Sequence, residues 1–193
     1  MLKKLRKRIR KNKNINKIKL IGKNVKLIDD IRAMVFHLDK QGPDLTYQLP
    51  NKLFPFSEAD FIKFSTFYYL AIGQGNNRNY GLFELPVPGY PEYHSMIYAF
   101  DVIDPDNEDP RAEGKNYCLL VILHPRWLRK FLHHSWKMEM IIQDYLLPYY
   151  KLENFRNSEI VDKLLTKIVP EIPSVYDVFE EDVSHLTEIK AIN

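Results

Sequence analysis

The stretch IRAMVFHLDKQGPDLTYQLP, residues 31–50, decides the fold because it holds two strand patterns joined by a turn. Over residues 31–38, apolar side chains fall on both faces of an extended chain, which is typical of a central strand covered on both sides. Gln41-Gly42-Pro43 predicts a turn. In LTYQLP, Leu45, Tyr47 and Leu49 alternate with polar residues, so we expect a second strand with one solvated face. The stretch therefore predicts a β-hairpin.

The elements that follow alternate less regularly but remain recognisable. Residues 57–73 predict a helix, because Ser57 is a good N-cap and Gly73 a natural stop. Three strand patterns cover residues 80–87, 94–104 and 116–124, and the last is apolar without interruption from Tyr117 to Leu123. Further helices are expected over residues 125–148, starting at Pro125, and over residues 158–169.

The predicted order of elements is β-β-α-β-β-β-α-α. The first and fifth strands are the two with apolar residues on both faces, so we place them side by side at the centre of a five-stranded sheet with the order 2-1-5-4-3. The helix at residues 57–73 would cover one face, and the C-terminal helices the other. The fold class is α/β (α+β type), a three-layer α/β/α sandwich with a mixed sheet.

Charge divides the chain into three parts. The chain has 193 residues, with 28 Lys+Arg against 25 Asp+Glu. Twelve of the basic residues and none of the acidic ones lie in residues 1–28, whereas six acidic residues lie in residues 171–193. We expect a basic arm over residues 1–28, a domain over 29–170 and an acidic tail over 171–193.

Composition excludes several classes of protein. One Cys rules out a disulfide framework and a multi-Cys zinc site, and it fits a reducing compartment. No apolar run approaches the roughly 20 residues that span a bilayer. The charged N-terminus lacks the apolar segment of a secretory signal. We expect a cytoplasmic protein, with the arm able to hold it at a membrane surface.

The basic arm has two interpretations from the sequence. It is either a solvated tail or an arm that binds anions on a membrane surface, on nucleic acid or on the protein's own acidic tail. No aromatic residue lies between Met1 and Asp29 to stack on bases, which argues against nucleic acid. The residues predicted to contact anionic lipid are Lys3, Lys4, Arg6, Lys7, Arg8, Arg10 and Lys11.

The residue chemistry gives little indication of an enzyme. The one close glycine pair, Gly73 and Gly75, follows a helix instead of opening one, so a phosphate-binding loop is not predicted. The acidic run at residues 104–109 lacks the Gly and Glu that a calcium loop needs, since Asp109 and Lys115 occupy those places. We expect no catalytic residues, no cofactor and no metal.

Part of the hairpin sequence resembles that of a known family of domains. Its matching residues are Gly42, Pro43, Thr46, Tyr47, Gln48, Leu49 and Pro50. Here the chain resembles longin domains, particularly the amino-terminal longin domain of the nitrogen permease regulator-like family, over about residues 28–168. The element order predicted above is also the longin order.

The resemblance implies a non-catalytic interaction module that binds a small GTPase, or another longin or roadblock-type domain, in membrane traffic or signalling. We expect the exposed edge strand or the helix beside it to pair with a partner or a second copy. The predicted binding residues are Gly42, Pro43, Tyr47, Tyr80, Leu82 and Phe83.

An alternative is a GTPase activator with an arginine finger. Some members of the family place that arginine in the loop before a middle strand, where this chain has Tyr93, His94 and Ser95. Arg78 and Arg111 lie in the neighbouring loops and are the alternative candidates.

Overall fold

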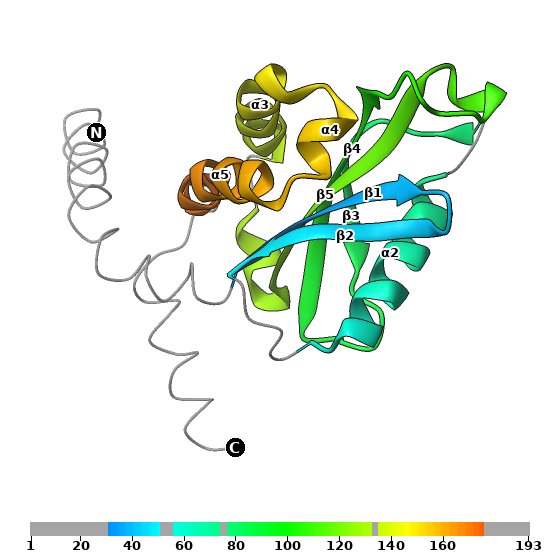
Figure 1. Ribbon diagram of the computed structural model, residues 1–193. Coiled ribbons are helices and arrows are strands. Elements are labelled where there is room, and N and C mark those ends of the chain that lie inside the picture. Colours follow the sequence, from blue (N-terminus) through cyan, green and yellow to red (C-terminus); the bar gives the residue numbers. More distant parts are fainter. Residues whose placement is uncertain (1–30, 51–55, 74–76, 133–134, 176–193) are drawn as a thin grey trace, which may run out of the picture.

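The computed structural model describes residues 31–50, 56–73, 77–132 and 135–175 (Figure 1). The predicted basic arm lies outside these residues, as does the tail after Val175. The strands are β1 (Arg32–Asp39), β2 (Gly42–Leu49), β3 (Gly81–Pro86), β4 (Tyr93–Ile103) and β5 (Lys115–Pro125). The α-helices are α2 (Glu58–Ile72), α3 (Ser135–Leu146), α4 (Leu152–Phe155) and α5 (Ser158–Ile168).

The five strands form one sheet in the predicted order β2-β1-β5-β4-β3. Every neighbouring pair is antiparallel, so the prediction of a mixed sheet is wrong. The cause is α2, which carries the chain back along the sheet after β2. Consequently β3 starts at the same end of the sheet as β2, and β5 runs in that direction too, opposite to β1 (Figure 1).

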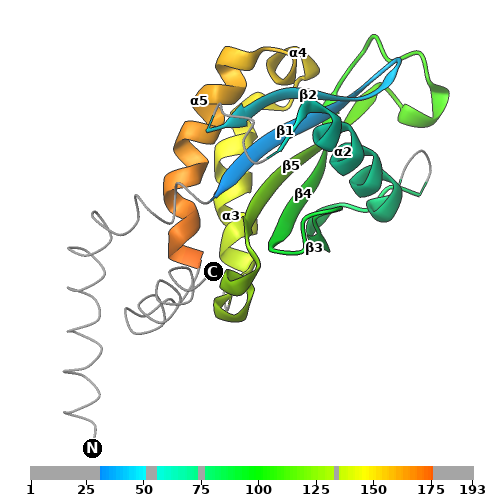
Figure 2. The same ribbon diagram turned by 90° about the horizontal axis from the view of Figure 1, so that it is seen from below.

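Helices cover both faces of the sheet, which gives the predicted three layers (Figure 2). One core contains α2 with Met34, Phe36, Leu119 and Val121. The other contains α3, α4 and α5 with the alternate side chains of the same central strands, such as Val35. The prediction that β1 and β5 are buried on both faces is confirmed.

The β1–β2 hairpin contains a bulge that the alternation pattern did not predict. Val35 pairs with Tyr47 and Phe36 with Leu45, so Thr46 is an extra residue in β2. Leu45 therefore packs in the α2 core, whereas Tyr47 packs against the opposite core. Both α2 and α5 contact β2, so the expected solvated face of this strand is covered.

The C-terminal segments differ from the sequence prediction at two places. A 3₁₀-helix, Arg126–Phe131, follows Pro125, and the α-helix begins only at Ser135. The folded chain also continues past residue 170, because Ile172 and Val175 are fully buried in the core. These two residues belong to the domain, not to the acidic tail predicted from residue 171.

Candidate functional site

Helix α2 exposes two large apolar side chains on its outer side. The predicted stripe of Phe61, Phe64, Tyr68 and Ile72 is buried against the sheet. On the opposite side, Ile62 is 67% exposed and Leu70 is 69% exposed, and Thr66 lies between them at helical spacing. We call Ile62, Thr66 and Leu70 the α2 outer face. From Phe64 to Ile72 the helix carries no charged residue, whereas the exposed Lys63 lies next to Ile62.

Strand β3 forms an edge of the sheet, whereas α2 directly contacts β2 at the other edge. Near the start of the helix, the Tyr90 hydroxyl donates to Asp60 Oδ2 at 2.7 Å, which ties α2 to the segment after β3. At its other end, Asn79 Nδ2 donates to the Ile72 carbonyl, which ties α2 to the segment before β3. Both ends of α2 are therefore linked to the segments that flank β3.

The binding residues predicted from the sequence lie at two opposite edges. Phe83 and Leu82 are half-buried on β3, Phe83 against the α2 core and Leu82 against the other core. Tyr80 just before β3 is 55% exposed, and its hydroxyl donates to Asp101 Oδ2 at 2.9 Å. Burial and this bond to a carboxylate raise the pKa of Tyr80.

Gly42, Pro43 and Tyr47 lie on β2, at the other edge of the sheet. Gly42 has a φ of +119°, a conformation that L side chains rarely adopt, so glycine is required at this turn. Tyr47 is half-buried in the core beneath α5 and is hydrogen-bonded to Asp162, and both effects raise its pKa. These contacts give Tyr47 a packing role.

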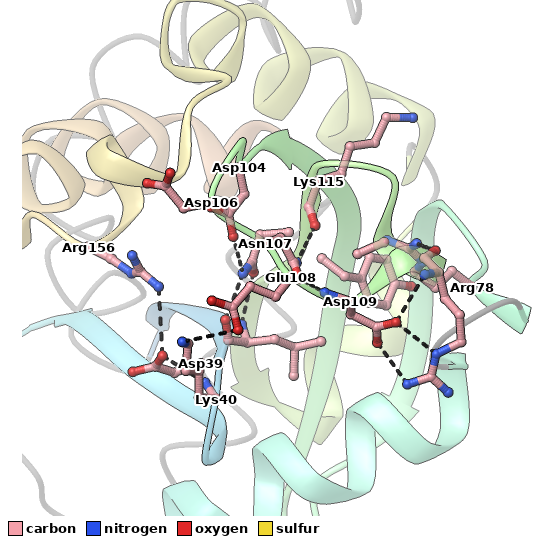
Figure 3. A pocket seen from close by; sticks show the side chains of 15 residues that line it. Asp39, Lys40, Arg78, Asp104, Asp106, Asn107, Glu108, Asp109, Lys115 and Arg156 are labelled. Atoms are coloured by element: carbon pink, nitrogen blue, oxygen red, sulfur yellow. Dashed lines mark hydrogen bonds and ion pairs between the residues drawn. The ribbon is translucent and has the colours of Figure 1, made fainter.

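A polar pocket of about 550 Å³ opens at the end of the sheet where the β1–β2 turn meets the β4–β5 loop (Figure 3). It is lined by residues from the end of β1 and the turn, the segment before β3, the β4–β5 loop, the start of β5 and the residue after α4. They are Leu38, Asp39, Lys40, Arg78, Asp104, Asp106, Asn107, Glu108, Asp109, Arg111, Ala112, Lys115, Asn116, Tyr117 and Arg156.

Hydrogen bonds within the chain hold the β4–β5 wall of the pocket in shape. The Asp104 amide donates to the Gly114 carbonyl at 2.8 Å, which closes the loop. Asn107 Nδ2 donates to the Lys115 carbonyl at 2.7 Å, and Asn107 Oδ1 accepts from the Asp109 amide. The loop that forms this wall is therefore organised without a ligand.

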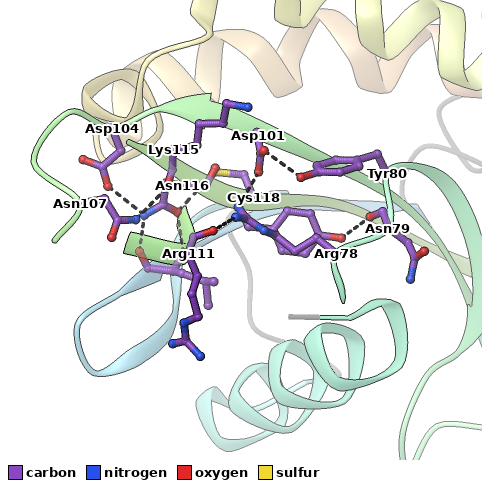
Figure 4. Close-up of polar contacts among 12 residues, drawn as sticks. Arg78, Asn79, Tyr80, Asp101, Asp104, Asn107, Arg111, Lys115, Asn116 and Cys118 are labelled. Carbon is purple, nitrogen blue, oxygen red and sulfur yellow. Dashed lines mark hydrogen bonds and ion pairs between the residues drawn. The ribbon is translucent and has the colours of Figure 1, made fainter. Parts of the chain in front are cut away.

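The structure brings the two candidate arginines together in this pocket (Figure 4). Arg78 donates to Asp101 Oδ1 at 3.1 Å and to the Arg111 carbonyl at 2.8 Å. Arg111 donates through Nε and Nη2 to the two Asp109 oxygens, and this lowers the pKa of Asp109 to about 2. Both guanidinium groups are thus engaged within the protein, and an arginine finger would have to leave these partners.

Sequence reasoning missed the residues that connect the pocket walls. Asn116 bonds both the amide and the carbonyl of Leu38, which is 78 residues away in the chain. Arg156 lies 3.7 Å from Asp39, again far apart in sequence. The feature of the sequence that indicated this pocket was the acidic run at residues 104–109. Within the described ranges, no three His, Cys, Asp or Glu side chains lie close enough together to hold a metal ion.

No protein-family model matches the chain, and no curated protein is significantly similar to it in sequence. Among the helices of the described part, none combines the length and the apolar character needed to cross a bilayer.

Proposed function

We propose that this chain is a longin-type interaction module that binds a protein partner through the α2 outer face and the β3 edge. The observation that carries the proposal is the pair of large apolar side chains, Ile62 and Leu70, that α2 exposes to solvent. A solvated helix normally presents charged or polar residues outward, and an exposed apolar surface next to a polar one is typical of a binding site.

The edge strand β3 offers a second contact to a partner. β3 pairs with β4 on one side and ends the described sheet on the other. An edge strand offers unpaired backbone N–H and C=O groups to a strand of a partner. Pro86, the last residue of β3, blocks such pairing at one end, so a partner strand would use the part from Gly81 to Leu85.

The class of partner follows from the resemblance together with the element order. We propose a small GTPase, or another longin or roadblock-type domain, in a membrane-traffic or signalling pathway of the cytoplasm. The order β-β-α-β-β-β-α-α and the sheet order support the longin fold that this proposal needs. The basic arm would add a peripheral contact to an anionic membrane.

Paired affinity capture tests the proposal. The bait is the full chain, incubated with extracts of the source cell loaded with GTP or with GDP. The test variant is Ile62→Glu with Leu70→Glu, and the matched control is Leu147→Glu, since Leu147 is 71% exposed outside α2 and β3.

We expect wild type and control to capture a GTPase, longin or roadblock protein that the double variant loses. Capture of the same proteins by all three baits would contradict the proposal. Light scattering on the purified chain covers self-pairing: a dimer that the double variant converts to a monomer would identify a second copy as the partner.

A further inference from the structure

Helix α3 exposes two large apolar side chains that lie one turn apart. Trp136 is 56% exposed and Met140 is 53% exposed, and their spacing along the helix places them on the same side of it. Met138 and Ile142, on the inner side, are fully buried in the core. We call Trp136 and Met140 the α3 outer face. Because covering apolar surface is favourable, this face is a candidate contact for another segment or molecule.

The described part of the chain ends next to the α3 outer face. After α5 the chain forms the 3₁₀-helix η5 (Val169–Val175), which contacts both α3 and α5. Val175 is fully buried in the same core as Met138 and Ile142. The end of α5 lies beside the start of α3, and the start of α3 carries the outer face (Figure 2). Residues 176–193 therefore follow from a point beside this face, and they form a longer segment than α3.

The sequence of residues 176–193 has apolar residues at helical spacing. The buried Val175 is followed, at intervals of three or four positions, by Phe179, Val183 and Leu186. Residues 180–182 between them are all acidic. This pattern is typical of an amphipathic helix that lays one side against a protein surface. The segment thus continues the apolar series that begins in the core at Val175.

Basic side chains lie around the place where this segment begins. Lys137 Nζ lies 5.9 Å from the centre of the Trp136 ring. Lys163 and Lys167 are exposed and lie one turn apart in the second half of α5, which is the half beside the start of α3 (Figure 2). These three lysines, on two neighbouring helices, favour an acidic segment as the occupant of the α3 outer face.

Charge also decides between the two ends of the chain. Residues 176–193 contain five acidic residues and one Lys, whereas residues 1–28 contain twelve basic residues and no acidic one. Of the acidic residues of α3, Glu139 lies on the β3 side, with Oε1 3.5 Å from the place of a Cβ on Gly81, and Asp144 lies one turn beyond Met140. The start of the outer face is therefore basic, which attracts the acidic segment and repels the basic arm.

We propose that residues 176–193 pack against the α3 outer face, with Phe179, Val183 and Leu186 toward Trp136 and Met140. The acidic residues of the segment then lie near the three lysines. Because the segment is attached beside its site, its effective concentration there is high, and a small apolar contact suffices. The α3 outer face lies on the other face of the sheet from α2, so this proposal does not depend on the function proposed for the α2 outer face.

Hydrogen–deuterium exchange of the full chain tests the contact from the side of α3. The test variant is Met140→Glu, which the domain accommodates because Met140 is more than half exposed. The matched control is Ile103→Glu, since Ile103 is an equally exposed apolar residue at the end of β4. In the wild type we expect amides of residues 179–186 to exchange at least about tenfold more slowly than in an unstructured peptide. Met140→Glu should abolish this protection, and Ile103→Glu should keep it.

A second pair of variants tests the contact from the side of the segment. Phe179→Glu with Leu186→Glu removes two apolar residues of the helical series, whereas Val178→Glu with Ile192→Glu changes two apolar residues outside it. Only the first pair should release the segment and speed the exchange of the α3 start, Ser135–Met140, to the rate in a chain that lacks residues 176–193.

Three results would overturn the proposal. The first is wild-type exchange of residues 179–186 at the rate of an unstructured peptide. The second is protection that persists in both Met140→Glu and the variant of Phe179 and Leu186. The third is protection that disappears on dilution together with a dimer seen by light scattering, because a second copy would then cover the α3 outer face. The variants of the segment leave residues 31–175 unchanged, so they decide the question even if Met140→Glu fails to fold.

Discussion

Two buried histidines lie side by side where β4 begins and β5 ends. His94 on β4 pairs with His124 on β5, and their rings lie 5.8 Å apart between centroids. Burial lowers the pKa of both, and it lowers that of His124 to about 4. The neighbouring Arg129 acts in the same direction. The fold therefore keeps this pair uncharged at neutral pH.

This pair predicts a pH-dependent stability. Because the pKa of His124 is lower in the folded protein than the ordinary value of 6.5, the unfolded chain takes up its proton first. The stability that the folded protein gains from an uncharged His124 is complete above pH 6.5. It decreases by up to about 3 kcal/mol as the pH falls toward 4. Urea unfolding at pH 7, 6 and 5 should show this loss, and the loss should be smaller in His124→Gln. The same pH slope in both proteins would refute the assignment.

A second residue-scale prediction concerns the β1–β2 turn. Gly42 has a φ of +119°, and no atom lies within 4 Å of the place where a Cβ would be. The substitution Gly42→Val therefore strains the backbone without a steric clash, and we expect a loss of roughly 1–3 kcal/mol of stability. Gln41→Val is the control, since it adds the same side chain at the exposed neighbouring position. Equal unfolding midpoints for the two variants in urea would mean that the turn tolerates any residue.

At the scale of single elements, the start of α2 depends on one carboxylate. Asp60 accepts hydrogen bonds from the Ser57 amide at 2.9 Å, from the Ser57 hydroxyl at 2.7 Å and from the Tyr90 hydroxyl. These bonds hold its pKa well below the usual range, with the Ser57 amide as the largest cause. They fix both the helix start and its attachment to the segment after β3.

Replacing Asp60 with Ala should therefore lower the melting temperature, by roughly 2–8 °C. Glu58→Ala is the matched control, because Glu58 also lies in the first turn of α2 but is exposed. Thermal melts followed by circular dichroism make the comparison. If both variants melt at the wild-type temperature, the contacts of Asp60 do not stabilise the helix.

The strands and helices could be predicted where the pattern of apolar residues within the segment itself determines the structure. β1 and β5 are recognisable because apolar residues on both faces have one simple structural cause, which is burial between two layers. The bulge at Thr46 was not predictable, because its cause lies far away in the chain: the Thr46 hydroxyl donates to the Phe155 carbonyl and bonds His37 Nδ1 at 2.9 Å. The strand direction was missed for a similar reason, since it depends on the path of α2.

At the scale of the whole molecule, the polar pocket could be predicted only in part. The acidic run before β5 and the two arginines are visible in the sequence, but their meeting at one place is a result of the sheet order. The link between the pocket walls depends on Asn116 and Leu38, which contact each other across 78 positions. The sequence already indicated α2 as a possible binding surface. Which residues of that helix are exposed became known only from the fold.

The basic arm predicts reversible binding to anionic membranes. Each Lys or Arg near such a surface contributes on the order of 1 kcal/mol, so binding should weaken as salt rises. Removing the acidic tail should strengthen binding, and the truncation should start at residue 176 because Val175 is buried. Sedimentation with vesicles that contain phosphatidylserine, at low and physiological salt, compares the full chain with chains lacking residues 1–28 or 176–193. If the full chain and the chain without the arm sediment alike, the arm is a solvated tail.

The central claim is that the α2 outer face and the β3 edge form the partner-binding surface. Hydrogen–deuterium exchange of the full chain, with and without the captured partner, tests it most directly because exchange reports protection along the whole chain. We predict slower exchange in Glu58–Ile72 and Gly81–Pro86 on binding, and no change in Ser135–Leu146 on the opposite face of the sheet. Protection confined to Ser135–Leu146 or to the β1–β2 turn, with α2 and β3 unchanged, would contradict the account.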